Sequence, residues 1–134
     1  MTKAEELTFA ALRAVNTQRA RRWHPGFPQE DGWTGADWSN AMCGEAGETA
    51  NVVKKLRRAE TNMKGALDPE RPVLVNHLAE EIADTLIYLD LLAAFYGIDL
   101  GAAVAAKFNK VSKREGLPER LPSVSSDEES EPSR

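Results

Sequence analysis

Two pairs of acidic residues constrain the fold of this chain more than any other feature. Glu45 and Glu48 form one pair, Glu81 and Asp84 form the other, and both lie in apolar sequence of helical periodicity. Residues three apart in a helix share a face, so each pair points its two carboxylates in one direction. If the two helices pack as antiparallel neighbours, four carboxylates meet in a half-buried cleft. Because like charges repel and raise one another's pKa, we expect a divalent cation that prefers oxygen ligands, Mg²⁺ or in its place Mn²⁺, to bind there.

The rest of the chain has the pattern of an all-α protein. Apolar periodicity and capping residues predict four helices, over residues 3–22, 34–59, 69–96 and 99–114. The second helix opens on a capping box at Thr34–Asp37, the third on Asp68–Pro69, and the fourth on Asp99. We therefore expect one helical domain over residues 1–116. Residues 117–134 contain prolines and then an acidic, low-complexity stretch, so we expect a disordered tail there.

The predicted third helix is apolar nearly all round. Apolar residues such as Ile82, Leu86 and Leu89 lie on several of its sides, which is typical of a helix buried by more than one neighbour. A chain of 134 residues cannot easily cover such a helix by itself. We therefore expect a homo-oligomer, most simply a two-fold dimer.

Composition and missing motifs exclude several classes of protein. The formal net charge of −4 argues against general binding to nucleic acid polymers. Cys43 is the single cysteine, which excludes an internal disulfide, and we expect it to be a small core residue. We expect a soluble, cytoplasmic protein with no membrane partner, since nothing resembles a signal peptide or a comfortable bilayer span. There is no glycine-rich phosphate loop, CxxC or GxSxG, and neither His24 nor His77 has the Glu-x-x-His spacing of di-iron bundles.

A loop rich in aromatic residues follows the first predicted helix. Trp23, Phe27, Trp33 and Trp38 lie close together in sequence, among two prolines and a glycine that break the helix. One interpretation is a stacking platform for a planar base. The other is that these rings seal the end of a helical bundle.

Basic residues gather at the ends of three predicted helices. They are Arg19, Arg21 and Arg22, then Lys55 on the Glu48 side of its helix, and then Lys107, Lys110 and Arg114 on one face. Cations near a helix C-terminus complement the helix dipole, which explains them without a ligand. The alternative is that some of them contact the phosphates of an anion held by the metal.

Carboxylates that hold Mg²⁺ beside lysines are typical of phosphoryl chemistry. The metal bridges phosphate oxygens, neutralises developing charge and lowers the pKa of an attacking water. A carboxylate that is not fully used as a ligand, Glu48 or Glu80, would accept the proton of that water as the catalytic base. The alternative from another class is a non-catalytic helical interaction module, in which both acidic pairs face solvent.

The motifs, taken in order along successive helices, resemble the MazG-like all-α nucleoside triphosphate pyrophosphohydrolases. The likeness rests on E-A-G-E at 45–48, on E-E-I-A-D-T-L-I-Y-L at 80–89 and on the basic segment 107–114, and it covers roughly residues 7–120. The stretch R-R-W-H-P at 21–25 is similar to one in the dCTPase-like and phage-type members. One departure is Gly44, where many relatives carry a glutamate immediately before ExxE.

The resemblance implies a fold and a reaction. The fold is a four-helix bundle assembled as a dimer, or as a tetramer of paired dimers. The reaction is the Mg²⁺-dependent hydrolysis of a (deoxy)nucleoside triphosphate to the monophosphate and pyrophosphate, for nucleotide-pool sanitation or for phage control of the pool. The tryptophans suit a large purine, so dGTP or GTP is favoured. A dUTPase-like or phosphoribosyl-ATP pyrophosphohydrolase-like enzyme on the same scaffold is the alternative.

The same resemblance implies roles for particular residues. The implied metal ligands are Glu45, Glu48, Glu81 and Asp84. The candidates for binding the phosphates are Lys55, Lys107, Asn109, Lys110 and Arg114. The candidates for lining the base pocket are Trp23, His24 and Trp38.

Overall fold

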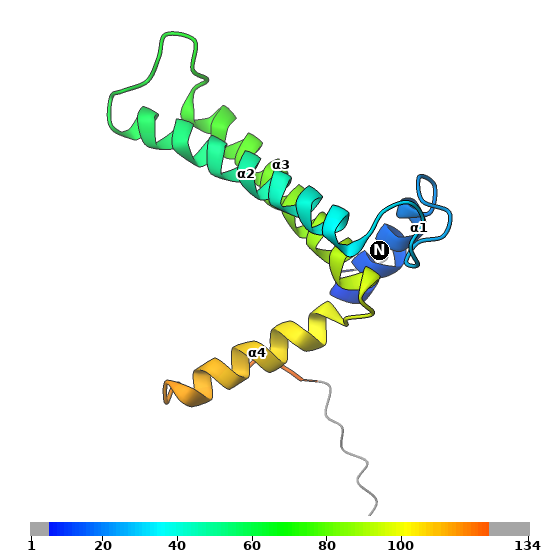
Figure 1. Cartoon of the computed structure of the whole chain (residues 1–134). Coiled ribbons are helices and arrows are strands. Elements are labelled where there is room, and N and C mark those ends of the chain that lie inside the picture. The colour runs from blue at the N-terminus through cyan, green and yellow to red at the C-terminus, as the bar shows by residue number, and fades with distance from the viewer. Residues whose placement is uncertain (1–5, 124–134) are drawn as a thin grey trace, which may run out of the picture. The chain divides into compact units, whose positions relative to one another are not determined.

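The computed structural model describes residues 6–123, which form four helices and no strand (Figure 1). The helices are α1 (Phe9–Ala20), α2 (Gly35–Glu60), α3 (Arg71–Phe95) and α4 (Leu100–Arg114). The all-α prediction is therefore confirmed. The chain divides after Ile98 into two compact units, the first with α1, α2 and α3 and the second with α4.

In the first unit, α2 and α3 form an antiparallel hairpin closed by the loop of residues 61–70 (Figure 1). Two clusters of buried apolar side chains hold the hairpin together. Near the loop, Val52 and Leu56 of α2 pack with Leu74 of α3. Near the open end, Trp38 of α2 packs with Leu91 of α3. Each buried side chain of this kind stabilises the fold by roughly 1.5–3 kcal/mol, so the two clusters fix the stretch between them, where the acidic pairs lie.

The first two helices begin at side-chain caps. Thr8 caps α1, since its Oγ1 accepts a hydrogen bond from the backbone N–H of Ala11 at 3.0 Å. This helix is shorter than predicted, and residues 3–5 of the prediction lie outside the described residues. The predicted capping box of α2 is confirmed, with the carboxylate of Asp37 accepting from the backbone N–H of Thr34 at 2.7 Å.

The predicted start of the third helix at Asp68–Pro69 is wrong. The carboxylate of Asp68 accepts a hydrogen bond from the backbone N–H of Gly65 at 2.8 Å, which closes a turn inside the loop. The helix begins at Arg71, two residues after the predicted start at Pro69, and Pro72 occupies its first turn. A proline is tolerated there because the N–H groups of a first turn have no partner within the helix.

In the second unit, α4 begins and ends as predicted. Asp99 caps it by accepting from the backbone N–H of Ala102 at 2.9 Å, and Gly116 follows its end with a positive φ of 69°. The amide of Asn109 donates to the carbonyl of Leu121 at 2.9 Å and accepts from its N–H at 2.8 Å. The first residues of the predicted tail, 117–123, are therefore held against α4, while residues 124–134 lie outside the described residues.

α3 is the most apolar of the four helices. Even so, no single helix within residues 6–123 is long and apolar enough to cross a membrane. Only α3 and α4 taken together pass that test, by length and composition.

Candidate functional site

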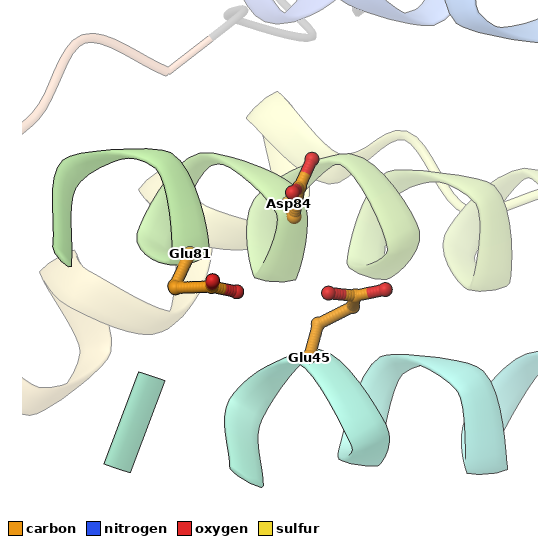
Figure 2. Close-up of side chains that lie close together, drawn as sticks. All are labelled: Glu45, Glu81 and Asp84. Carbon is orange, nitrogen blue, oxygen red and sulfur yellow. The ribbon is translucent and has the colours of Figure 1, made fainter. Parts of the chain in front are cut away.

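Three carboxylates meet in the middle of the α2–α3 hairpin. Glu45 projects from α2 and Glu81 from α3, and their side chains point toward each other (Figure 2). Asp84 lies about one turn further along α3, and one oxygen from each of the three residues lies within 4.8 Å of the others. We call Glu45, Glu81 and Asp84 the carboxylate cluster. Glu81 is buried, Glu45 is half-buried and Asp84 is exposed, so the cluster is open to solvent on one side.

Two threonines tie the helices together beside the cluster. The hydroxyl of Thr85 donates to the carbonyl of Glu81 at 2.9 Å, and it lies 3.1 Å from the hydroxyl of Thr49 on α2. Since the Thr85 proton is used in the first bond, Thr49 is the donor in the second. These two hydrogen bonds fix the register of α2 and α3 where the carboxylates face each other. The sequence prediction missed both threonines, although each directly follows the second acid of a pair.

The carboxylates raise the energy of one another's charged forms. The pKa of Glu45 lies above its ordinary value, first because burial disfavours its charge and then because of repulsion from Glu48, Asp84 and Glu81. Glu48 therefore acts electrostatically on the cluster although its side chain is exposed and lies outside it. An oxygen-only donor set with excess negative charge fits a hard divalent cation such as Mg²⁺ or Mn²⁺.

His77 supports the most buried carboxylate of the cluster. Its Nε2 lies 2.7 Å from Oε1 of Glu81, one turn along α3. A partner at this distance limits the rotamers of Glu81. Groups that orient a metal ligand in this way contribute to the affinity of the site.

A pocket of about 280 Å³ adjoins the carboxylate cluster. It is lined by Arg19, Trp23, Glu45, Asp84, Ile87, Tyr88 and Leu91. Its walls thus combine two acids, one cation and several flat or apolar side chains, which suits a ligand with both charged and planar parts. The sequence left open whether the arginines of the first helix only complement its dipole. The structure separates them, since Arg19 lines the pocket whereas Nε of Arg21 donates to the carbonyl of Phe27 at 2.8 Å.

Comparison with known families decides the class of this site. A sequence model of the MazG nucleotide pyrophosphohydrolase domain matches residues 36–117, more than half of the chain. The chain belongs to the MazG nucleotide pyrophosphohydrolase family. It is therefore a hydrolase that acts on nucleoside triphosphates, and not a non-catalytic interaction module. The match includes both acidic pairs and leaves α1 outside. A search of curated proteins finds no match, and membership of the dCTPase-like or phage-type subgroup stays a prediction.

Within this MazG enzyme, the aromatic residues divide between the buried core and the wall of the pocket. Phe27 and Trp38 are 2% and 3% exposed and belong to the buried cluster at the open end of the hairpin, so they seal the bundle. The ring of His24 packs against Trp33 and Trp38, with centroids 4.9 and 5.1 Å apart. The burial of Trp38, whose ring packs against His24, Phe27 and Trp33, argues against the prediction that it contacts the base. Trp23, by contrast, is 68% exposed and lines the pocket.

Three other predicted site residues lie outside the pocket of this MazG enzyme. Glu48 and Glu80 are exposed and do not belong to the carboxylate cluster. Lys55 is half-buried on α2, about two turns beyond Glu48, and is not among the residues that line the pocket. The charge of Glu48 nevertheless helps to raise the pKa of Glu45.

The remaining predicted phosphate ligands belong to the second unit, which contains α4. The side-chain amide of Asn109 forms both of its hydrogen bonds with the backbone of Leu121, so in this structure Asn109 holds the C-terminal segment. Nε of Arg114 donates to the carboxylate of its neighbour Glu115 at 2.7 Å. Lys107 and Lys110 are exposed on α4.

The prediction for the single cysteine is wrong. Cys43 is exposed rather than buried in the core. It precedes Glu45 by two residues, about 200° around the helix, so it lies on the opposite side of α2 from the inward-facing carboxylate.

We predict that Glu45→Gln stabilises the metal-free protein while weakening metal binding. The substitution removes a charge that burial and three nearby carboxylates disfavour, so the thermal midpoint in a chelator should rise by about 3 °C. Saturating Mn²⁺, which at 100 times its Kd adds roughly 2.7 kcal/mol to the stability of a protein that binds it, should stabilise wild type much more than the variant. Scanning calorimetry with and without Mn²⁺ measures both effects.

Glu60→Gln is the matched control for this prediction. Glu60 is an exposed glutamate at the last position of α2, outside the carboxylate cluster, so its loss should change neither midpoint by much. A Glu45→Gln variant that is less stable than wild type in the chelator, and that keeps the full gain from Mn²⁺, would show that Glu45 has another role.

Proposed function

We propose that this enzyme hydrolyses a (deoxy)nucleoside triphosphate to the monophosphate and pyrophosphate in a reaction that depends on Mg²⁺, with Mn²⁺ as a substitute. One observation carries the proposal. The carboxylate cluster opens directly into a pocket that also presents a cation, Arg19, and an exposed indole, Trp23. A metal site, a partner for phosphate and a stacking surface for a base thus lie side by side.

Each carboxylate has a proposed part. Glu45, Glu81 and Asp84 hold the cation, and Glu48 completes the set or accepts a proton from the attacking water. A bound divalent cation would neutralise charge on the triphosphate and lower the pKa of a water. Glu80 precedes Glu81 by one residue and so projects about 100° away from it around α3, which makes it the weaker candidate for the base.

The nucleotide would lie across the end of α1. Trp23 offers an exposed ring face for the base, and Arg19 offers a guanidinium for a phosphate oxygen. Lys55 and the α4 residues Lys107, Lys110 and Arg114 are further candidates for the phosphates. Because Trp38 is buried, the preference for dGTP or GTP now rests on Trp23. Control of the nucleotide pool is the biological role that such a reaction favours.

We expect purified enzyme with Mg²⁺ to release pyrophosphate, and no free phosphate, from at least one of the common NTPs and dNTPs. The size of Trp23 favours dGTP or GTP as the best substrate. Chromatography of the nucleotide products, with separate assays for pyrophosphate and phosphate, checks this. Release of phosphate alone would contradict the proposed scissile bond. A preference for dUTP or phosphoribosyl-ATP would assign the related activity on the same scaffold.

Paired variants separate the roles of the acids in that assay. Asp84→Asn should lower kcat by about 100-fold or more, because it removes a ligand to the cation. Glu48→Gln should also lower kcat strongly. Glu80→Gln is the control, since Glu80 is exposed like Glu48 but projects about 100° away from Glu81 around α3, and this variant should stay near wild type. The reverse pattern for Glu48 and Glu80 would make Glu80 the base.

We further propose that the enzyme is a homodimer that buries the outer face of α3. On this face Ile82, Leu86 and Leu89 are 53%, 39% and 36% exposed, at the i, i+4, i+7 spacing of a continuous apolar stripe. Leu86 also lines an apolar groove of about 310 Å³ with Leu7, Phe9 and Leu12 of the α1 region. A second copy, related by a two-fold axis, presents the same stripe and so covers this one.

The substitution Leu86→Lys should convert the dimer to a monomer, because it places a charge in the centre of the stripe. Light scattering after size-exclusion chromatography measures the mass. Leu67→Lys is the matched control, since Leu67 is 98% exposed in the loop of residues 61–70, and this variant should keep the wild-type mass. A wild-type monomer would contradict the proposal, and a mass of four chains would add a second interface.

A further inference from the structure

We propose that a buried ionic contact between α1 and α3 sets the position of Arg19 and Trp23, and that Asp90 is therefore a positioning residue for substrate binding. The inference rests on the proposed function, because it assigns the nucleotide to the pocket that these two side chains line. It concerns residues that lie outside the carboxylate cluster and outside both acidic motifs.

Asp90 is fully buried on α3 and receives hydrogen bonds from two residues of α1. Nε of Arg13 donates to its Oδ1 at 2.9 Å, and Nδ2 of Asn16 donates to its Oδ2 at 3.1 Å. The same Nδ2 also donates to the backbone carbonyl of Ile87 at 3.0 Å. Every donor of this network thus belongs to α1 and every acceptor to α3, so the network defines how one helix sits on the other.

Stability alone does not explain such a contact. Burying an ion pair requires desolvation of both charges, and well-packed apolar residues are often as stabilising or more so. Among residues 6–123, the buried Nη2 of Arg13 and Oδ1 of Asn16 have no hydrogen-bond partner, which is a further cost. Charged and amide groups, unlike apolar ones, form hydrogen bonds only at defined distances and angles. This network therefore fixes the rotation of α1 about its own axis and its distance from α3.

The network lies directly behind the nucleotide pocket. Its acceptor residue Ile87 and the neighbour of Asp90, Leu91, both line the pocket on the α3 side. On the α1 side, Arg19 follows Asn16 by three residues and so shares its face of the helix. Beyond the network, α1 meets α3 through apolar side chains, among them Ala20 in the buried cluster with Leu91 and Leu12 in the groove with Leu86. Apolar contacts do not fix one angle between two helices, so without the network α1 can turn on α3, which would move Arg19 and Trp23.

The carboxylate cluster does not depend on α1 in this way. Its members come from α2 and α3, which two apolar clusters and the Thr49–Thr85 contact hold together. The family match, too, covers the hairpin but not α1. Metal binding and nucleotide binding are therefore separable. A change in how α1 packs on α3 should weaken nucleotide binding far more than metal binding.

The test compares steady-state kinetics and Mn²⁺ affinity for wild type and Asp90→Asn, with the best nucleotide of the substrate panel. Loss of the charge should raise KM by about tenfold or more, because a binding group displaced by about 1 Å loses much of its contribution. The Kd for Mn²⁺, measured by calorimetry, should stay within about twofold. The double variant Arg13→Gln with Asp90→Asn, which replaces the ion pair by two neutral amides, should recover part of the wild-type KM.

Two further variants keep the result open to refutation. Leu74→Ala removes a buried side chain at the far end of the hairpin, so it lowers stability without touching α1, and its KM should equal that of wild type. Asn16→Ala is the milder disruption of the network and should raise KM in the same direction if Asp90→Asn is unfolded at the assay temperature. A folded Asp90→Asn or Asn16→Ala enzyme with unchanged KM would overturn the inference, as would a loss of Mn²⁺ affinity equal to the change in KM. A wild type inactive on every nucleotide would instead contradict the proposed function, and the inference with it.

Discussion

Repulsion between carboxylates that face each other across the α2–α3 hairpin is the constraint on which the rest of this structure depends. Burial and three neighbouring acids raise the pKa of Glu45, so the metal-free hairpin carries an unfavourable charge at its centre. Apolar clusters on either side, around Trp38 and around Leu74, offset that cost and hold the helices in place. The Thr49–Thr85 contact sets their register. The arrangement gives up stability without metal in return for affinity toward a divalent cation.

Within the first unit, the α2–α3 hairpin and α1 supply different groups to the pocket. The hairpin gathers the acids, while α1 and the turn after it bring Arg19 and Trp23 to the edge of the same pocket. The family match covers residues 36–117, so it includes the carboxylate cluster and leaves Arg19 and Trp23 outside. The hydrogen bonds of Asp90 connect α1 to the hairpin.

Features determined by neighbouring residues in sequence could be predicted, and features determined by tertiary packing could not. The capping residues Thr34 and Asp99 locate the starts of α2 and α4, because a cap acts within one turn. The spacing of Glu81 and Asp84 likewise places both acids on one side of α3. The start of α3 was predicted too early, since Asp68 prefers a turn with Gly65 to capping a helix. Nothing local distinguishes a tryptophan that seals the core, Trp38, from one that lines the pocket, Trp23. An aspartate in an apolar helix, as at position 90, does signal a buried partner, but the sequence does not say which residue supplies it.

Anomalous diffraction from crystals soaked in Mn²⁺ tests most directly whether the hairpin acids form a metal centre. We expect a peak bonded to oxygens of Glu45, Glu81 and Asp84, with Glu48 as a ligand or in contact with a water on the metal. A peak elsewhere on the protein, with these carboxylates facing solvent and no ion between them, would contradict the metal site and the reaction proposed for it.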